Sequence, residues 1–368
     1  MAKKRVAIMT GGGDCPGLNA VIYGAVRVGI ARYGWEVLGV EDATRGLIDL
    51  AYAFPHGNQW LTLESVRPIL SRGGTILGTS NRSDPFNFVV RNADGTEGTI
   101  DVSDRVVENF KKLDLSALIS IGGDGSMRIA KLLIDKGIPI VGVPKTIDND
   151  LASTDQTFGF DTAVQIATEA LDRVRDTAES HDRVMIVEVM GRDAGFIALH
   201  AGIAGGADAI LIPEIPYRLE PIAETVKARR AAGQTYSVIV VAEGAKPKDG
   251  QASVGEHKAG AMPRLMGAGM RVADGLGPMI AAELRVTVLG HIQRGGSPSN
   301  YDRVLAVRYG QAAAELVERG EFGRMVALRG GEITSVAIAE ASAANKRVDP
   351  RGQLVSTARA IGVTFGDE

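Results

Sequence analysis

Short apolar runs alternate along the chain with segments whose apolar residues recur at helical spacing. The clearest example is the stretch 117–150, ALISIGGDGSMRIAKLLIDKGIPIVGVPKTIDND. Residues 117–121 predict a buried strand, the glycine-rich GGDGS predicts a tight turn, and the apolar positions in 127–134 predict a helix. A second strand is predicted at 138–143, and the polar segment 146–150 follows it directly.

The same alternation of strands and helices continues through most of the chain. Further strands are predicted at 5–10, 35–41, 183–189, 209–212, 236–242 and 285–289, and further helices at 16–33, 104–113, 161–178 and 301–318. Alternating strands and helices favour an α/β fold with mainly parallel sheets. Because 368 residues exceed the usual size of one domain, two doubly wound domains are expected. Their expected bounds are 1–155 plus 295–345, and 156–294 plus 346–368.

Polar, glycine-rich turns follow several of these strands. In open α/β sheets, ligands bind at the carboxyl ends of the strands, and the two turns within 117–150 would lie at the ends of neighbouring parallel strands. The turn GGGDCPGLN at 11–19 matches neither the P-loop pattern nor the dinucleotide fingerprint. Three glycines before a helix still let backbone N–H groups approach an anion. A phosphate site and a plain tight turn both stay open there.

Composition excludes several classes of function. The net charge of −3 provides no basic field for nucleic acid or an anionic membrane. One cysteine, Cys15, excludes an internal disulfide and a metal site built from several thiolates. No apolar run approaches membrane-spanning length, and the first residues lack a signal-peptide core, so a cytoplasmic protein is expected. The polar segment 244–260, rich in Lys and Gly, predicts a mobile loop or lid.

Acidic residues in two of the turns are candidates for chemistry. Asp124 stands between glycines at a strand end, and one carboxylate is enough for a Mg²⁺ that keeps water and phosphate oxygens as its other ligands. In TIDND, Asp148 and Asp150 alternate along a segment predicted to be extended, so both can point to one side and one could accept a proton from a hydroxyl. Asp and Asn are also ordinary turn residues. Lipid kinases and NAD kinases carry a turn similar to GGDG.

Basic residues stand at or beside the ends of other strands. Arginine binds phosphate through two parallel hydrogen bonds, which suits such positions to a phosphorylated ligand. Taken singly, each is more often an ordinary surface or structural residue. The group consists of Arg82, Arg183, Arg192, Arg285, His291 and Arg294.

Five motifs occur together in one order: GGGDCPG, GGDGS, PKTIDND, MGR and GHIQRGGSP. This combination resembles the 6-phosphofructokinase family, and the match extends from residue 11 to about residue 306. The resemblance implies Mg²⁺-dependent transfer of a phosphoryl group to the 1-hydroxyl of fructose 6-phosphate, in a cleft between two α/β domains. It also implies a homodimer or homotetramer whose substrate site is shared between subunits.

The resemblance assigns roles to the matching residues. Asp148 would be the general base and Asp124 the Mg²⁺ ligand. The rest of the catalytic set would be Thr146, Gly125, Lys145 and Arg192. The donor phosphates would lie along Gly13, Arg82, Ser83, Gly123, Asp124, Gly125 and Ser126. Fructose 6-phosphate would lie against Thr146, Ile147, Asp148, Met190, Gly191, Arg192, Glu243, His291, Ile292, Gln293 and Arg294. Two further arginines would reach it from a neighbouring subunit, Arg183 and Arg285.

Three positions bear on the phosphoryl donor. Pyrophosphate-using members of the family resemble GGDD or GGED, where an aspartate in place of Gly125 occupies the space of the ATP α-phosphate. They also carry lysine where this chain has Lys145, and bacterial ATP enzymes carry an aromatic where it has Thr44. An obstructing carboxylate excludes ATP more firmly than an ammonium, which can pair with a terminal phosphate. The resemblance therefore implies ATP, in the mixed-substrate branch of the family, with pyrophosphate as the alternative donor.

Overall fold

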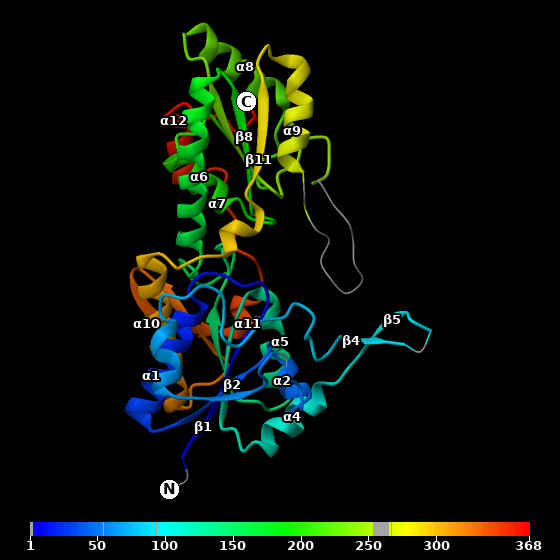
Figure 1. The fold of residues 1–368 in the computed structure, drawn as a ribbon, viewed down its shortest axis with the longest axis vertical. Coiled ribbons are helices and arrows are strands. Elements are labelled where there is room, and N and C mark those ends of the chain that lie inside the picture. Colours follow the sequence, from blue (N-terminus) through cyan, green and yellow to red (C-terminus); the bar gives the residue numbers. More distant parts are fainter. Residues whose placement is uncertain (1–2, 54, 93, 253–264, 266) are drawn as a thin grey trace.

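Two mainly parallel sheets organise the protein (Figure 1). The computed structural model describes residues 3–53, 55–92, 94–252, 265 and 267–368. In the described chain, the larger sheet has the strand order β13–β12–β7–β6–β1–β2–β3 and the smaller has β11–β8–β10–β9. The parts built around them are called here the large-sheet half and the small-sheet half. Each lies in its own region of the molecule, one below the other in Figure 1.

The large sheet is covered by helices on both faces. Val6 and Ile8 pack in one core with α1 and α10, whereas Ala7 and Met9 pack in another with α4 and α5. Burial on both faces explains why its strands are continuous apolar runs. The strands are β1 (Arg5–Thr10), β2 (Glu36–Val40), β3 (Gln59–Leu61), β6 (Ala117–Gly122), β7 (Ile140–Pro144), β12 (Arg324–Arg329) and β13 (Glu332–Ala337). The helices are α1 (Leu18–Tyr33), α4 (Ser103–Lys112), α5 (Asp124–Asp135) and α10 (Asn300–Arg319).

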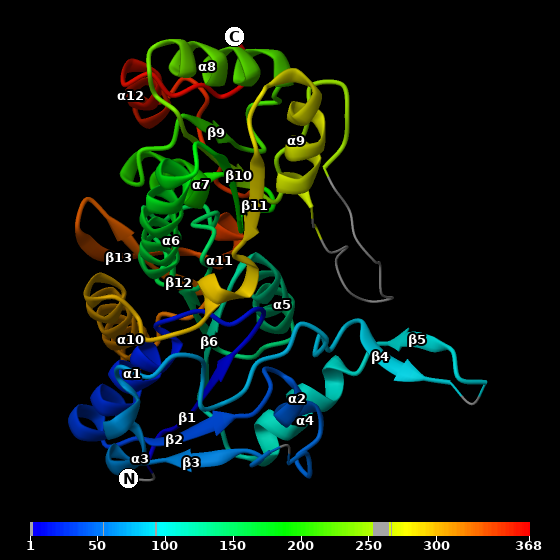
Figure 2. The ribbon, with the colours of Figure 1, turned by 45° about the horizontal axis from the view of Figure 1, so that its top comes forward.

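The small sheet has the same layered construction (Figure 2). Val187 and Val240 pack with α6 and α7 on one face, and Ile186 and Ile239 pack with α8 and α9 on the other. Its strands are β8 (Val184–Val189), β9 (Ala209–Leu211), β10 (Ser237–Ala242) and β11 (Leu284–Val288). Its helices are α6 (Phe160–Ser180), α7 (Phe196–Ala204), α8 (Leu219–Ala231), α9 (Ala268–Leu276) and α12 (Gln353–Ala360).

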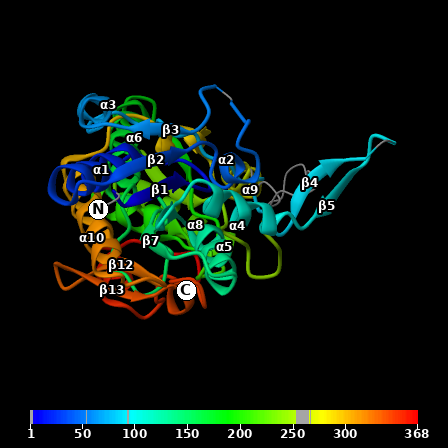
Figure 3. The same ribbon diagram turned by 90° about the horizontal axis from the view of Figure 1, so that it is seen from below.

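Shorter elements connect and decorate the two halves. The hairpin of β4 and β5 extends away from the body (Figure 3). The short helices are α2 (Arg45–Ile48), α3 (Leu63–Val66), α11 (Ile338–Ala341), and the 3₁₀ turns η1 (Arg67–Ile69), η2 (Gly277–Met279) and η3 (Gly290–Arg294). The hairpin strands are β4 (Phe88–Arg91) and β5 (Glu97–Ile100). Among the described helices, none combines the length and apolar character that crossing a membrane requires.

Most of the predicted fold is confirmed. Each predicted strand is present with ends shifted by at most two residues, and β6 and β7 are parallel neighbours. One prediction differs from the structure. GGDGS is not a turn throughout, because α5 already begins at Asp124, where a carboxylate in the first helical turn is favoured by the helix dipole. The sheets are mainly parallel as predicted, and the edge strands β3 and β13, which were not predicted, are antiparallel to their neighbours. The predicted lid, 244–260, lies partly outside the described residues, and the domain bounds stay a prediction.

Candidate active site

The carboxyl ends of β6 and β7 bring the two acid-bearing segments together. These strands pair in parallel, with Gly122 opposite Pro144. Asp124 begins α5 immediately after β6, and its side chain is 48% exposed, with Oδ2 lying 3.6 Å from Arg128 Nη2. The charge of Asp124 contributes to the raised pKa of Asp150, after burial as the main cause. The carboxylates of Asp124 and Asp150 are therefore close enough to influence each other at this edge of the large sheet.

The TIDND segment is bent, so the prediction of an extended segment is wrong. Asn149 has a φ of 52°, in the left-handed region that Asn tolerates better than most residues. The backbone N–H of Asp148 donates to Thr146 Oγ1 at 3.1 Å, and this local bond replaces the pairing that an extended strand would need. Asp148 and Asp150 still lie close together, because the charge of Asp150 contributes to the raised pKa of Asp148.

Asp148 has the electrostatic character of a general base. Burial, and then the neighbouring Asp150, raise its pKa to about 7, while Arg294 opposes the shift. Its Oδ1 is buried and has no hydrogen-bond partner among the described residues. A buried carboxylate oxygen without a partner is rare in proteins and indicates a site for a ligand group. A base is most effective when its pKa lies near the working pH, so a pKa of about 7 suits a base that works near neutral pH.

The small-sheet half supplies residues from the carboxyl ends of β8 and β10. These strands pair with Val189 opposite Ala242, so the MGR turn and Glu243 are neighbours. Gly191 has a φ of 137°, and a Cβ there would lie 2.8 Å from the Ala194 carbonyl, so the turn requires glycine. Burial raises the pKa of Glu243, while Arg294 and Arg192 lower it. Both arginines therefore lie near this carboxylate.

The turn η3 joins the two halves. Gln293 Oε1 accepts a hydrogen bond of 2.8 Å from the Met190 N–H, which ties η3 to the MGR turn. Arg294 Nη1 donates to the Asp14 carbonyl at 3.2 Å, in the turn that follows β1. His291 and Ile292, also predicted substrate contacts, have exposed side chains, and Ile292 is 67% exposed. The predicted substrate contacts of all four η3 residues stay a prediction.

The glycine turn after β1 is lined by two cations. Lys145 is 4% exposed, and its Nζ donates to the Gly13 carbonyl. A Cβ on Gly12 would lie 3.2 Å from that Nζ, and a Cβ on Gly13 would lie 2.9 Å from Arg294 Nη1. Burial lowers the pKa of Lys145. Between the two interpretations that the sequence leaves open, this arrangement favours an anion site.

The start of α5 leaves open space beside it. A Cβ on Gly125 would have one described atom within 4 Å, Arg128 Nη2 at 3.7 Å. By contrast, the side chain of Ser126 packs against Gly11, because a Cβ added to Gly11 would lie 2.9 Å from Ser126 Oγ. Thr44 is buried and donates to the Ser83 carbonyl, so it offers no surface to a ligand. These contacts leave room for a ligand beside Gly125.

Arg183 and Arg285 lie at the opposite end of the small sheet from the other predicted arginines. Arg183 precedes β8 and its Nε lies 2.7 Å from Glu283 Oε2, and Arg285 pairs with the same carboxylate. The strand β8 separates Arg183 from Arg192, a distance of about 20 Å for six extended residues. Arg183 and Arg285 therefore lie far from Arg192 within one subunit, and their predicted role in a neighbouring subunit stays a prediction.

The acids fit a hydrated magnesium ion better than a metal held by protein alone. No group of three or more His, Cys, Asp or Glu side chains placed to hold a metal was found in the described part of the chain. The half-exposed carboxylate of Asp124 suits Mg²⁺, which keeps water and phosphate oxygens as ligands.

Sequence reasoning missed Asp193, which also contributes to the raised pKa of Asp148. Its place inside MGRDAG was the available signal.

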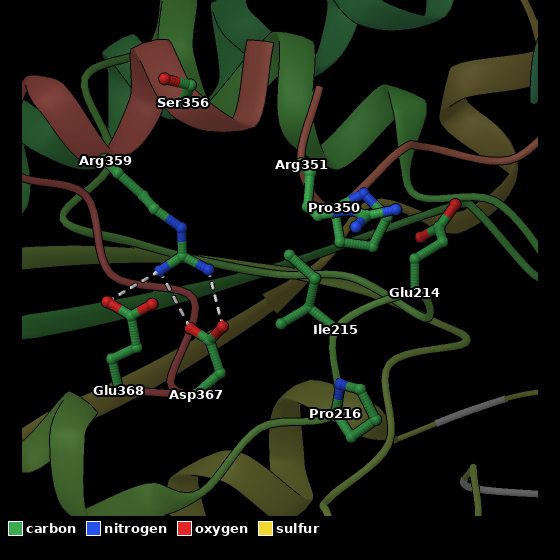
Figure 4. Close-up of a pocket in the computed structure, with 9 residues that line it drawn as sticks. All are labelled: Glu214, Ile215, Pro216, Pro350, Arg351, Ser356, Arg359, Asp367 and Glu368. Atoms are coloured by element: carbon green, nitrogen blue, oxygen red, sulfur yellow. Dashed lines mark hydrogen bonds and ion pairs between the residues drawn. The ribbon is translucent and has the colours of Figure 1, made fainter. Parts of the chain in front are cut away.

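An open pocket of about 520 Å³ lies in the small-sheet half, away from these residues (Figure 4). Arg359 points into it and pairs with Asp367 at 2.6 Å and with Glu368 at 3.7 Å. The cation in the pocket is thus neutralised by the last two residues of the chain. None of the described lining residues belongs to the predicted site, so the pocket does not carry the predicted chemistry.

Together, the fold and the site define a class of protein. Two α/β halves meet at strand ends that carry a base with a raised pKa, a half-exposed carboxylate and several fixed cations, the parts that phosphoryl transfer needs. A model of the family described as PFK, phosphofructokinase, matches residues 5–317. The chain belongs to the phosphofructokinase family.

Relatives with two different donors are about equally similar to this chain. The ATP-dependent 6-phosphofructokinase 2 of Clostridium perfringens is 51% identical over 367 residues, which cover 99% of each chain. A pyrophosphate–fructose 6-phosphate 1-phosphotransferase of Amycolatopsis methanolica is also 51% identical, over 94% of this chain and 96% of its own. Overall identity to these two does not separate the donors.

A solved structure has the same fold. Phosphofructokinase from Saccharomyces cerevisiae matches with a TM-score of 0.77 and 32% identity, over 98% of this chain. The match covers 47% of the yeast chain, so this protein spans about half the length of that relative. The two-domain α/β prediction agrees with this structure.

Proposed function

We propose that this protein is an ATP-dependent 6-phosphofructokinase. It transfers the γ-phosphoryl group of ATP to the 1-hydroxyl of fructose 6-phosphate, which yields fructose 1,6-bisphosphate and ADP. The observation that carries the proposal is Asp148, a carboxylate with a pKa of about 7 whose buried Oδ1 has no hydrogen-bond partner among the described residues, placed among acids and cations from both halves. The Clostridium perfringens relative bears the name of this activity. A cytoplasmic location stays the expectation.

Asp148 acts as the general base in this mechanism. As the sugar oxygen bonds to the γ-phosphorus, the bond from phosphorus to the β,γ-bridging oxygen breaks and its electron pair leaves with ADP. The hydroxyl proton passes to Asp148. Proton acceptance by a positioned side chain contributes about 10² to 10⁴ in rate. Thr146 holds the bend that presents Asp148.

The cations neutralise the phosphate charge. Lys145 and Arg294 flank the glycine turn, and Arg294 and Arg192 both lie near Glu243 on the sugar side. Fixed cations stabilise the equatorial charge of a transferring phosphoryl group without reorganising during the step. Asp124 would hold Mg²⁺, which when bound supplies further charge neutralisation at the phosphate oxygens.

ATP is favoured over pyrophosphate by the surroundings of Gly125 and Lys145. Space beside Gly125 is open, whereas an aspartate there would put a negative charge near the polyphosphate. Lys145 does not fill this space, because its ammonium donates to the Gly13 carbonyl in the glycine turn after β1. Pyrophosphate remains the second candidate, since the Amycolatopsis methanolica relative bears that name.

A shared site between subunits accounts for Arg183 and Arg285. Both lie near the amino ends of β8 and β11, remote from Asp148 in their own subunit, and β11 is an edge strand. At the other end of β11, Val288 is 55% exposed. A homodimer or homotetramer that covers this edge would bring the two arginines to a neighbour's sugar phosphate.

The test is formation of fructose 1,6-bisphosphate from fructose 6-phosphate and Mg²⁺, with ATP and pyrophosphate as parallel donors. Turnover with ATP supports the proposal. Turnover with pyrophosphate and none with ATP would show that open space at Gly125 is insufficient for ATP, and would turn attention to Lys145 and Thr44. Absence of turnover with both donors contradicts the proposal.

A further inference from the structure

Residues 345–348 cross between the two halves, in the connection from α11 to α12 (Figures 1 and 2). The helix α11 packs against α5 of the large-sheet half, and α12 packs against α7 of the small-sheet half. We call residues 345–348 the strap. The strap lies beyond residue 317, where the family match ends, and contains none of the predicted site residues.

The side chain of Lys346 in the strap binds the loop that follows the base. Its Nζ donates to Asn149 Oδ1 at 3.2 Å, to the Thr154 carbonyl at 3.1 Å and to the Asp155 carbonyl at 2.9 Å. An ammonium group has three N–H donors. All three therefore have an oxygen partner on one short segment of chain.

The backbone of the strap binds the same loop. Lys346 N–H donates to the Asp150 carbonyl at 2.7 Å, and Asn345 forms an antiparallel bridge with Leu151. Asp150 is thus held directly by the strap. The contact is independent of the lysine side chain, so a substitution of that side chain leaves it in place.

Asn149 is the residue through which Lys346 reaches Asp148. Its φ of 52° lies in the left-handed region, which Asn tolerates better than most residues and which surrounding contacts hold in place. Asn149 Oδ1 accepts from Lys346 Nζ and, at 3.0 Å, from the Thr157 N–H. These two bonds hold the residue that stands between Asp148 and Asp150.

Lys346 also faces the small-sheet half. Its Nζ lies 5.4 Å from the ring centre of Phe196, the first residue of α7. Burial lowers the pKa of Lys346 to about 8, while the charges of Asp155 and Asp150 raise it. Desolvating an ammonium is unfavourable unless its hydrogen bonds are satisfied, so the three oxygen partners are required for this placement.

The far end of the strap binds the second loop of the site. Val348 N–H donates to Glu214 Oε1 at 2.8 Å, and the same carboxylate accepts from the Gly195 N–H at 3.0 Å. Gly195 ends the MGRDAG turn that carries Arg192. The strap therefore contacts the base loop directly and the sugar-phosphate loop through Glu214.

We propose that Lys346 is a positioning residue, which acts through Asn149 to hold the loop of Asp148 in its productive geometry. The inference rests on the proposed function, because it concerns the same reaction. Lys346 contacts none of the predicted reacting groups and none of the predicted substrate-binding residues. Its loss should therefore lower kcat and leave KM nearly unchanged. A displacement of about 1 Å in a reacting group lowers rate about a hundredfold.

The experiment compares Lys346→Met with wild type in fructose 6-phosphate phosphorylation by ATP. The variant keeps a long side chain and loses all three donors. We expect kcat to fall about 10- to 100-fold while KM for either substrate changes less than about threefold. Lys136→Met is the matched control and is expected to leave kcat unchanged, because Lys136 pairs with Asp104 at 2.7 Å and lies 5.9 Å from the Phe86 ring, outside the site.

Two further measurements separate positioning from general stabilisation. In hydrogen exchange, the Thr157 amide of Lys346→Met should exchange faster than in wild type, with the amides of β1 unchanged. Asn149→Gly keeps the left-handed backbone accessible but removes Oδ1, so its kcat should fall similarly. Because both substitutions act on the same contact, the kcat of the double variant should lie within about threefold of the kcat of the slower single variant.

Several outcomes would overturn the inference. They are a folded Lys346→Met with wild-type kcat, a loss confined to KM, or losses that multiply in the double variant. If Lys346→Met does not fold, Asn149→Gly decides, and wild-type kcat in that variant contradicts the inference. Absence of turnover by the wild-type protein would instead contradict the proposed function.

Discussion

The two ends of the small sheet carry the same kinds of residue in different surroundings. At the carboxyl ends, Arg192 and Arg294 lie near the half-buried Glu243, and Arg294 also lies near Asp148. Near the amino ends, Arg183 and Arg285 pair with the solvent-exposed Glu283. In the proposed function, the first group belongs to a site formed within one subunit, and the second acts at the site of a neighbouring subunit. Position on the sheet, and not residue type, separates the two groups.

Removing the base should produce the largest difference between the two ends. Asp148→Asn keeps the side-chain volume and abolishes proton acceptance, so kcat should fall by about 10³. Glu283→Gln makes the same chemical change near the amino end and should leave kcat within about threefold of wild type. Steady-state kinetics with ATP measures both. Equal losses in the two variants would contradict the distinction.

Truncating an arginine at the carboxyl end should have the next largest effect. Arg294→Ala removes a cation that binds the Asp14 carbonyl and faces Asp148, so kcat/KM for fructose 6-phosphate should fall about 10²-fold. Arg294→Lys should recover part of this loss. A kcat/KM equal to wild type in Arg294→Ala would remove Arg294 from the site.

The arginines near the amino end should act across subunits. Arg183→Ala should lower kcat/KM about tenfold by loss of one charge-assisted bond. Mixed with Asp148→Asn subunits, it should form hybrid oligomers in which some sites have both Asp148 and Arg183 intact. Activity above that of the two separate variants supports a shared site. No gain after confirmed subunit exchange would place Arg183 outside it.

The pH dependence should also differ between the ends. Because Asp148 must be ionised to accept a proton and its pKa is raised to about 7, kcat/KM should rise with pH through about 7 and then level. Arg183 lowers the pKa of Glu283, so Glu283 stays ionised over this range. Glu283→Gln should therefore keep the wild-type profile, whereas Asp148→Asn should lose the rise near pH 7.

The smallest expected effect is on stability. Since burial raises the folded-state pKa of Asp148 from 3.8 to about 7, ionisation destabilises the folded state increasingly between these pH values and by a constant amount above them. Asp148→Asn should therefore raise the melting temperature by a few degrees at pH 8 and by less near pH 5. Thermal unfolding at both values measures this. A variant less stable at pH 8 than wild type would contradict the sign.

Local features were predictable because they depend on neighbours in the sequence. Every strand that was predicted from an apolar run is present in the structure. The polar segments that follow two of these strands predicted Asp124 and Asp148 as site residues. The turn GGDGS was partly misjudged because helix-terminal stabilisation at Asp124 outweighs glycine content. The bend at Asn149 was missed because a side-chain bond to the Asp148 N–H replaces strand pairing there.

By itself, the sequence determined the α/β class, the family and the residue types of the site, because periodicity and motif order are properties of the linear chain. The tertiary structure decided which ends of the strands meet. It brought Arg294 to Asp14, placed Arg183 at the far end of β8, and bound Lys346 to Asn149. The Lys346–Asn149 contact joins positions 197 residues apart in the sequence, and the Arg294–Asp14 contact joins positions 280 residues apart. Both depend on how the two sheets pack, and no local pattern encodes them.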